Sequence, residues 1–526
     1  MGLESKPVSE LLSEVERGEI ALPEIQREFV WKPHQIRDLI DTIYREYPAG
    51  LLLFWEKPYG EEIPYALVGG ASVTTSGGYR SLVVDGQQRI TSLLKVKRGE
   101  IKIYFNPVSE EFQLESSRIR ADPLWFNVSD VMNMNKSLFD ILNEEREKKL
   151  KEQGVSDQKR SEIIKRLERL RVCLNNYHFP VYKIPSNVTY EQITEIFTRI
   201  NYKGTRIKTT DLVIAMFSVR APAVFRKELR QLLSDLSDEN WDLDASVLIR
   251  SLVGVAKGEG NLTNFRRTGM KITRNELMKG LQETREYIMQ LIQIMKDLGI
   301  DSSDILPSGN VIPPIVTYLK RKNGKISDDE KKQIILWFLL SSFWGRYAGA
   351  TDTRLGEDVK GALTGTLAPL FNNLRQQVGR LAIDKESFIE RSYGNEFLLY
   401  LICYKQGALD WFKGYRIKTK FQKHHIFPRS LLEKTLKEEE YDLISHIANF
   451  AFLTEKANKT IRNSEPIKYL PNIPIERLKQ QFVPLDKKLW KMKNYKKFLD
   501  VRTELIVEAI NEWFKELGIK KFIGSI

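Results

Sequence analysis

The fold of the N-terminal part is decided by the stretch Leu82-Val83-Val84-Asp85-Gly86-Gln87-Gln88-Arg89-Ile90-Thr91-Ser92-Leu93-Leu94. Its apolar start predicts a short buried strand, Gly86 permits a tight turn, and the residues that follow predict a helix. The start of such a helix offers free N–H groups and a positive dipole end, which suit a phosphate. Arg89 adds a forked cation in the first turn. A strand–Asp-Gly–helix corner is commonly only a turn, and that alternative stays open.

Other segments surround this stretch. A helix is expected from about His34 to Tyr47, and a second strand from Ile101 to Phe105. The Gly/Ser/Thr-rich stretch from Gly69 to Gly78 predicts a loop. A charged helical arm or hairpin is expected from about Ser137 to Val172, because apolar residues recur there at three- and four-residue spacing. Residues 190 to about 410 are expected to be mostly helical.

Two further motifs accompany the first. They are Leu22-Pro23-Glu24-Ile25-Gln26-Arg27-Glu28-Phe29-Val30-Trp31 and Phe197-Thr198-Arg199-Ile200-Asn201-Tyr202-Lys203-Gly204-Thr205, the latter leading to Thr210-Asp211-Leu212. Together the three resemble the N-terminal domain of the GmrSD family of type IV restriction enzymes, which carries P-x-x-QR-x-x-x-W, DGQQR and RIN-x-x-G-x-x-x-x-x-x-DL in this order. The resemblance implies a ParB/sulfiredoxin-like core and a C-terminal HNH domain.

The resemblance also implies binding and hydrolysis of a nucleoside triphosphate, GTP or ATP. In that reading Arg89 and the Gly86 backbone hold phosphates, and Gln87 or Gln88 positions water. Asp85 binds Mg²⁺ or orients Arg27. The nucleotide-binding residues expected are Gln26, Arg27, Asp85, Gly86, Gln87, Gln88, Arg89 and Asn201.

The C-terminal part holds two of the five histidines side by side, in Lys423-His424-His425-Ile426-Phe427-Pro428. Downstream lies Ile447-Ala448-Asn449-Phe450-Ala451-Phe452-Leu453-Thr454-Glu455-Lys456-Ala457-Asn458-Lys459. This order resembles the HNH, or ββα-metal, nuclease motif. The step of nine residues from Asn449 to Asn458 is similar to that in the HNH domain of RNA-guided CRISPR nucleases.

The residue types suit phosphodiester hydrolysis, which needs an activated water and help for the leaving oxygen. Carried over by position, His425 is the general base, and His424 and Asn458 bind a divalent metal, Mg²⁺ or Mn²⁺. Asn449 holds the loop and orients the base. A histidine in place of the more common aspartate as first ligand favours Mn²⁺, Co²⁺ or Ni²⁺. The alternative is that the histidines serve packing and the asparagines cap helices.

Two features around this motif add to the prediction. The gap from His425 to Asn449 is long and holds the acidic run Glu438-Glu439-Glu440, which is expected to be a surface insertion. His446 is either a further ligand or a structural residue, and the structural role is favoured.

Charge favours a polyanionic partner, and a well-solvated basic surface stays open as the alternative. The 526-residue chain has a net charge of +13, and residues 401–526 hold 25 Lys plus Arg against 15 Asp plus Glu, which is +10 of that total. Charge gathered in one place indicates nucleic acid more strongly than an even spread does. The DNA-binding residues expected are Lys487, Lys488, Lys491, Lys493, Lys496 and Lys497.

Two distant cysteines, Cys173 and Cys403, exclude a disulfide framework. The apolar run from Ile334 to Trp344 is too short to span a bilayer, and the N-terminus has no apolar signal core. A cytoplasmic location without a membrane partner is expected.

The fold class expected is a multidomain α+β protein. Residues 1–130 form the ParB-like nucleotide-binding domain, 131–410 a mainly helical region that completes and links it, and 411–526 the HNH nuclease domain. The function expected is a nucleotide-regulated, metal-dependent endonuclease that defends against phage or foreign double-stranded DNA, modified phage DNA included. The alternative is a nucleotide-gated DNA-binding regulator with an inactive HNH fold. An RNA target and a homo-oligomer also stay open.

Overall fold

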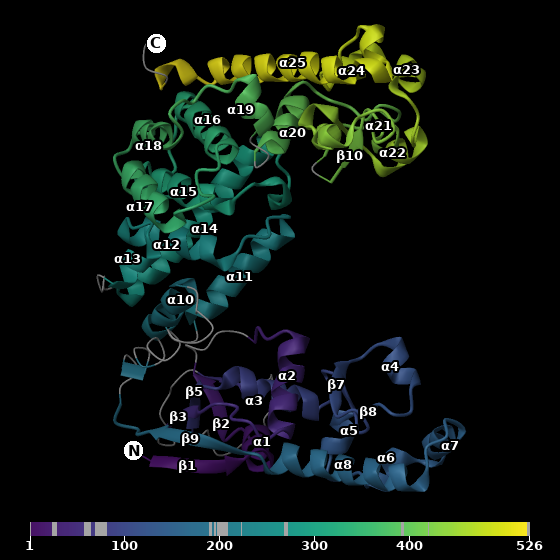
Figure 1. Ribbon diagram of the computed structural model, residues 1–526. Coiled ribbons are helices and arrows are strands. Elements are labelled where there is room, and N and C mark those ends of the chain that lie inside the picture. The colour runs from purple at the N-terminus through teal and green to yellow at the C-terminus, as the bar shows by residue number, and fades with distance from the viewer. Residues whose placement is uncertain are drawn as a thin grey trace. The chain divides into compact units, whose positions relative to one another are not determined.

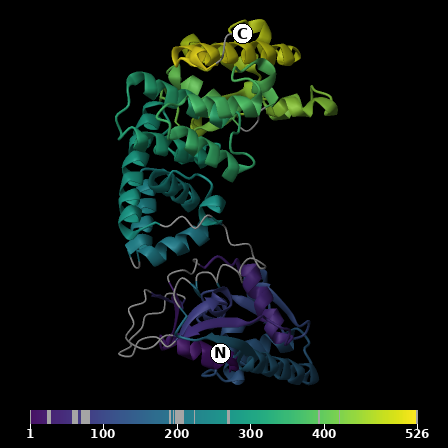
Figure 2. The ribbon, with the colours of Figure 1, turned by 90° about the vertical axis from the view of Figure 1, so that its left-hand side faces the viewer.

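The computed structural model forms two compact units, Met1–Arg226 and Lys227–Ile526. It describes residues 2–23, 29–56, 65–68, 81–188, 192–193, 196, 209–221, 224–267, 272–390, 394–418 and 420–522. The described chain is mixed α+β and mostly helical, as expected (Figures 1 and 2). The expected three-part division stays a prediction, and so do the ParB-like and HNH folds.

The first unit contains a six-stranded mixed sheet in the order β1-β9-β3-β5-β2-β4. Strands β2 and β5, and strands β3 and β9, run parallel, whereas the other neighbours run antiparallel. The strands are β1 (Gly2–Pro7), β2 (Ile20–Pro23), β3 (Leu52–Glu56), β4 (Tyr65–Leu67), β5 (Ser81–Asp85) and β9 (His178–Ile184).

Both faces of this sheet are buried because alternate side chains of a strand point to opposite sides. On β3, Leu52 and Phe54 join one apolar core, whereas Leu53 and Trp55 join the other. The first core is covered by α1 (Val8–Glu16), α2 (Pro33–Tyr44), α3 (Gln87–Lys97) and α8 (Asp157–Asn176). The second includes residues of α10 (Thr209–Arg220). The Asp85-Gly86 corner thus follows a strand that is buried on both faces.

A smaller antiparallel sheet, in the order β7-β6-β8, and four short helices complete this unit. They are β6 (Ile103–Asn106), β7 (Glu111–Leu114), β8 (Phe126–Asn127), α4 (Ser117–Ala121), α5 (Val128–Met132), α6 (Leu138–Leu142) and α7 (Glu144–Glu152). The strand expected at Leu82–Val84 is confirmed as β5, and the arm expected from residue 137 corresponds to α6, α7 and α8.

Two expected boundaries were wrong. Helix α2 ends at Tyr44 rather than Tyr47, because Glu46 takes a left-handed φ of 56° that ends the helix before Pro48. Strand β6 begins at Ile103 rather than Ile101, because the N–H of Ile101 bonds to the carbonyl of Lys95 in the turn after α3. The expected Gly69–Gly78 loop lies outside the described residues.

The second unit begins with a layered helical region. Its helices are α11 (Val224–Asp238), α12 (Ala245–Lys257), α13 (Leu262–Arg267), α14 (Arg274–Asp297), α15 (Ile312–Arg321), α16 (Asp328–Phe343), α17 (Thr351–Ala362), α18 (Ala368–Val378), α19 (Lys385–Glu390) and α20 (Asn395–Lys405), with short 3₁₀ turns η2 (Ser303–Ile305) and η3 (Gly309–Val311). Residues 334–343 of α16 are all buried, which explains that apolar run. No described helix is long and apolar enough to cross a membrane.

The chain then forms a C-terminal part with an apolar core of its own. Its elements are β10 (Gln422–His425), α21 (Arg429–Leu432), η4 (Glu438–Ser445), η5 (Ile447–Asn449), β11 (Phe450–Leu453), α22 (Glu455–Ile461), α23 (Pro466–Tyr469), η6 (Leu470–Asn472), α24 (Ile475–Gln480), η7 (Lys487–Trp490), η8 (Met492–Asn494), α25 (Tyr495–Glu516) and η9 (Ile519–Lys521). Phe427 packs against Tyr495 and Phe498, so α25 supports the segment after β10.

A buried ion pair lies within the helical region. Arg346 and Asp358 are 2% and 0% exposed, and Arg346 Nε donates to Asp358 Oδ2 over 2.9 Å. Tyr347 and Asn373 donate to the same carboxylate. Every oxygen of Asp358 is therefore satisfied, as burial of a charge requires.

Removing this carboxylate is expected to destabilise the second unit strongly. Asp358→Ala leaves the buried Arg346 cation without its main partner, which costs roughly 3–5 kcal/mol of unfolding free energy. The matched control is Glu357→Ala, because Glu357 pairs with the same Arg346 but its side chain is 50% exposed. That change should cost less than about 1 kcal/mol. Urea unfolding curves measure both, and equal losses would contradict the buried-pair argument.

Candidate functional site

The residues of the C-terminal motif lie on a two-stranded hairpin followed by a helix. Strands β10 and β11 pair antiparallel, with His424 opposite Ala451 and His425 opposite Phe450. Helix α22 begins after Thr454, whose side chain accepts a hydrogen bond from the N–H of Ala457. In Figure 1 the green α22 lies beside β10, as their contacts also show. The order strand, strand, helix brings His424 and Asn458 together.

His424 is 2% exposed, and both of its ring nitrogens face polar atoms. Its Nε2 lies 3.2 Å from the Tyr469 hydroxyl, and that hydroxyl donates to the carbonyl of Ile426 over 2.8 Å. The hydroxyl proton is therefore committed, so the oxygen accepts from Nε2–H. Burial lowers the pKa of His424 to about 4, which keeps the ring neutral at pH 7. Nδ1 then carries the lone pair.

Asn458 faces this lone pair. Its Oδ1 lies 2.8 Å from His424 Nδ1, while its Nδ2 donates to Gln422 Oε1 over 2.9 Å. When Nδ1 carries the proton, this contact is a hydrogen bond from Nδ1–H to Oδ1. When Nδ1 carries the lone pair, two acceptor atoms face each other, and a cation between or beside them would stabilise that arrangement. In octahedral coordination at 2.0–2.1 Å, neighbouring ligand atoms are about 3 Å apart, close to this separation. His424 Nδ1 and Asn458 Oδ1 therefore fit two ligand positions of a divalent metal.

The rest of a metal's coordination shell would come from outside these two side chains. The described part of the chain holds no group of three or more His, Cys, Asp or Glu residues placed to bind an ion. Hard divalent cations keep several waters and bind phosphate oxygens readily. A metal at this position would therefore leave sites for water and a phosphate.

His425 lies next to this pair and is half-buried against the ring of Phe450, with ring centroids 4.7 Å apart. Burial, and then the cations of Arg429 and Lys423, lower the pKa of its ring. No hydrogen bond joins this ring to another residue in the described ranges. A neutral imidazole with an open nitrogen can accept a proton.

Asn449 is fully buried and fastens the segment after His425. Its Oδ1 accepts from the N–H of Phe427 over 2.9 Å, and its Nδ2 donates to the carbonyls of Phe427 and Ile444. The Asn449 carbonyl also accepts from the N–H of Ile426. These are the contacts of a side chain that holds a loop.

Sequence reasoning missed two supporting residues. Arg502 of α25 is 0% exposed and donates to the carbonyls of Ala448 and Gln481 over 2.6 and 2.8 Å. Burial lowers its pKa to about 10, so it stays charged at pH 7. Tyr469 orients His424, as described above. Both lie outside the motif, and neither has a sequence signal of its own.

His446 and the six lysines predicted to bind DNA lie outside the metal pair. His446 caps η5, because its Nδ1 accepts from the N–H of Ala448 over 3.1 Å. This contact fits the structural role. The six lysines predicted to bind DNA are all exposed, and Lys496 pairs with Glu440. A shallow hollow of about 700 Å³ runs along α22 and is lined by Glu455, Lys456, Lys459, Thr460 and Arg462.

The N-terminal motif forms a tight corner between β5 and α3. Gly86 has a φ of +99°, and a Cβ there would lie 2.2 Å from Leu52 Cδ2, so only glycine fits. Arg89 pairs with Asp85 over 2.9 Å and donates to the Ala49 carbonyl over 3.0 Å. A phosphate at this corner would share Arg89 with Asp85.

The two glutamines of the corner differ. Gln88 Oε1 accepts from the N–H groups of Val30 and Trp31, which fixes the chain ahead of α2. Gln87 is 6% exposed, and its buried Oε1 has no hydrogen-bond partner in the part of the chain that the structure describes. Such an acceptor is costly to leave unpaired, so Gln87 is the stronger candidate of the two for contact with a ligand. Gln26, Arg27 and Asn201 lie outside the described residues.

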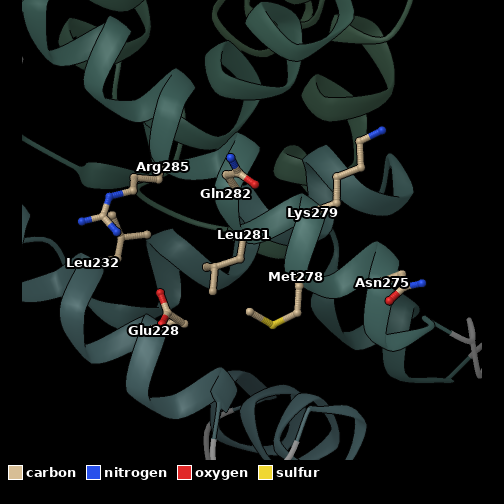
Figure 3. Close-up of a pocket in the computed structure, with 8 residues that line it drawn as sticks. All are labelled: Glu228, Leu232, Asn275, Met278, Lys279, Leu281, Gln282 and Arg285. Atoms are coloured by element: carbon tan, nitrogen blue, oxygen red, sulfur yellow. The ribbon is translucent and has the colours of Figure 1, made fainter.

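A further hollow, of about 540 Å³, lies between α11 and α14 (Figure 3). It holds none of the predicted site residues. Its lining combines apolar and charged side chains: Glu228, Leu232, Asn275, Met278, Lys279, Leu281, Gln282 and Arg285.

Comparison with known proteins adds evidence for the first unit. Over 587 aligned residues the chain is 22% identical to an uncharacterized protein of Methanocaldococcus jannaschii, and the alignment covers 97% of this chain and 99% of that protein. Residues 8–218 match the model of the GmrSD restriction endonuclease, N-terminal domain. That range contains the Asp85–Arg89 corner. The match supports the GmrSD-type restriction enzyme family for this chain.

Proposed function

We propose that this protein is a metal-dependent DNA endonuclease of restriction type, controlled by a nucleotide bound in its N-terminal unit. The similarity of residues 8–218 to a GmrSD N-terminal domain suggests a restriction-type defence nuclease. The observation that carries the proposal is the convergence of His424 Nδ1 and Asn458 Oδ1 at 2.8 Å beside the ring of His425, which makes no hydrogen bond to another described residue. We assign the hairpin and α22 to the HNH, or ββα-metal, class.

The proposed reaction is hydrolysis of a DNA phosphodiester. His425 takes the proton of a water as its oxygen attacks phosphorus, and Asn449 keeps the strand end in place by holding Phe427. His424 and Asn458 would hold Mg²⁺ or Mn²⁺. The metal, when bound, supplies a positive charge that stabilises the phosphate and the leaving oxygen.

The exposed face of α22, the helix that carries Asn458, suits a DNA backbone. Lys456, Lys459 and Arg462 line the hollow along α22, and Glu455 is the one acidic residue of that lining. Cations that follow a phosphate chain give sequence-independent affinity. We propose that the exposed lysines from 487 to 497 extend this contact to double-stranded DNA.

The nucleotide site is proposed at the start of α3. Gly86 turns the backbone there, no described side chain caps the start of the helix, and Gln87 Oε1 has no hydrogen-bond partner among the described residues. A helix N-terminus of this kind suits a phosphate. Arg89 would turn from Asp85 to a phosphate, and Asp85 would then be available to Mg²⁺. Either GTP or ATP fits this chemistry.

Digestion of plasmid and modified phage DNA, with and without each metal and nucleotide, tests the whole proposal. Metal-dependent cuts that change with nucleotide support it. Binding without cleavage under every condition would favour the rival, a nucleotide-gated DNA-binding regulator. Cleavage of RNA but not of DNA would show that the substrate is RNA.

His425→Ala should lower cleavage by about 10²–10⁴-fold, because a positioned base is lost while the metal pair remains. DNA binding and the melting temperature should not change. His34→Ala is the control, since His34 is an exposed histidine of α2. Cleavage rates on one plasmid compare the three proteins. Equal rates for His425→Ala and wild type would refute the assignment of the base.

Loss of either ligand should weaken metal binding. His424→Ala and Asn458→Ala are expected to raise the Mn²⁺ concentration for half-maximal cleavage on the order of tenfold or more, and Asn458→Asp should restore an oxygen ligand. Asn472→Ala, an exposed asparagine nearby in sequence, is the control. Mn²⁺ titration followed by electron paramagnetic resonance measures binding apart from activity. Cleavage that persists in excess EDTA would exclude the one-metal mechanism.

Arg89→Ala should abolish nucleotide hydrolysis, because a helix N-terminus alone stabilises an exposed anion by only about 0.3–1 kcal/mol. It should also change how DNA cleavage responds to nucleotide, as coupling between the sites requires. Arg98→Ala, at the other end of α3, is the control. Phosphate release and cleavage are followed across a nucleotide titration. Flat, identical cleavage curves for all proteins would leave two independent activities.

A further inference from the structure

An exposed aromatic turn leads into strand β10. The turn comprises residues 411 to 416, Trp411-Phe412-Lys413-Gly414-Tyr415-Arg416, and is called the aromatic turn below. Trp411 is buried, whereas Phe412 is 41% and Tyr415 63% exposed. Exposed apolar groups that lie together and are rimmed by polar residues mark candidate interaction sites. They belong to neither the metal pair nor the base.

The aromatic turn is held from its inner side. Asp410 is fully buried, and its Oδ1 accepts from the N–H groups of Phe412 and Lys413 over 3.0 and 2.9 Å. Its Oδ2 accepts from both donors of Thr454 at the start of α22. The turn therefore presents its rings from a fixed backbone, which lowers the entropy lost when a ligand covers them.

Two more contacts close the turn. The N–H of Asp410 bonds to the carbonyl of Tyr415 over 2.7 Å. Arg477 donates to the carbonyl of Trp411 over 2.9 Å, and a Cβ at Gly414, where φ is +69°, would lie 2.9 Å from Arg477 Nη2. The sequence thus uses a glycine where the turn approaches the guanidinium.

The aromatic turn is adjacent to the candidate metal pair. The Trp411 ring lies edge-on to the His424 ring, with centroids 5.7 Å apart, and also contacts Tyr469. Because Trp411 begins the turn, Phe412 follows directly from a residue that supports a proposed ligand. The aromatic turn therefore begins at a residue that packs against the candidate metal pair.

Charge indicates what covers the rings. Residues 411–432 contain six Lys or Arg and no Asp or Glu: Lys413, Arg416, Lys418, Lys420, Lys423 and Arg429. All six are exposed. Lys423 and Arg429 pair with Glu396 and Glu433 from outside this stretch. Exposed rings within a field of cations are typical of surfaces that bind nucleic acid through both bases and phosphates.

We propose that Phe412 and Tyr415 stack on DNA bases beside the phosphodiester that this protein cuts, while Lys413, Lys418 and Lys420 contact the flanking phosphates. This inference rests on the proposed function. It assigns the aromatic turn to base contact and α22 to the DNA backbone. An aromatic ring can stack on any base, so the contact needs no particular sequence. Stacking on a duplex substrate would separate neighbouring bases near the cut.

The test measures binding in EDTA, so that no cleavage occurs. Full-length protein is titrated into labelled oligothymidylate of about 20 nucleotides and into an abasic strand with the same number of phosphates. Wild type should bind the thymidylate roughly five- to a hundredfold more tightly, the scale of one or two base–ring contacts. Phe412→Ala/Tyr415→Ala should bind both strands alike, at the wild-type affinity for the abasic strand.

Two control variants separate the contribution of the aromatic rings to binding from that of the charges. Lys413→Ala should weaken binding to both strands equally and reduce the salt dependence. Phe139→Ala removes a ring that is 75% exposed in the first unit and should change neither affinity. Equal binding of both strands by wild type, a preference that survives in the double variant, or binding of neither strand would each overturn the inference. Base preference without cleavage under any condition would instead refute the proposed function alone.

Discussion

The side-chain amide of Asn449 is the contact on which the C-terminal site depends. It pairs with both backbone polar groups of Phe427, and both residues are fully buried. Strand β10 has only four residues, so its ladder alone fixes little. If the segment after His425 moved, two backbone groups and one amide would lose their partners away from water, each at a cost of about 1–3 kcal/mol. The position of His425 follows from this constraint.

Gln481 repeats the arrangement on the other strand. Its amide accepts from the N–H of Phe452 and donates to the carbonyl of the same residue, and it is also fully buried. In effect, a side chain replaces a third strand at the edge of the hairpin. Arg502 donates to the backbone carbonyls of Gln481 and of Ala448, which precedes Asn449, so one buried cation joins the two segments that carry these amides. A two-stranded ladder that would be marginal alone is thereby fixed.

The sequence was sufficient for local features and insufficient for contacts between distant segments. A short apolar run and glycine chemistry predicted β5 and the Gly86 turn, because both signals are local in the sequence. The motif spacing predicted that His424 and Asn458 belong together, although their roles stay predictions. Tyr469, Gln481 and Arg502 could not be predicted, since their partners are fixed by tertiary packing. Trp411 and Asp410 precede the motif and show their connection to it only in three dimensions.

The strand order of the first unit has a consequence for synthesis. Strand β9 pairs with both β1 and β3, so it lies within the sheet although it follows them by more than a hundred residues in the chain. While a ribosome makes this protein, β1 and β3 emerge long before the strand that joins them. The edges of β1 and β3 that pair with β9 stay unpaired until β9 is made, and closing so large a loop is slow. Chaperone capture of nascent chains should therefore peak before Ile184 leaves the exit tunnel and fall once it has.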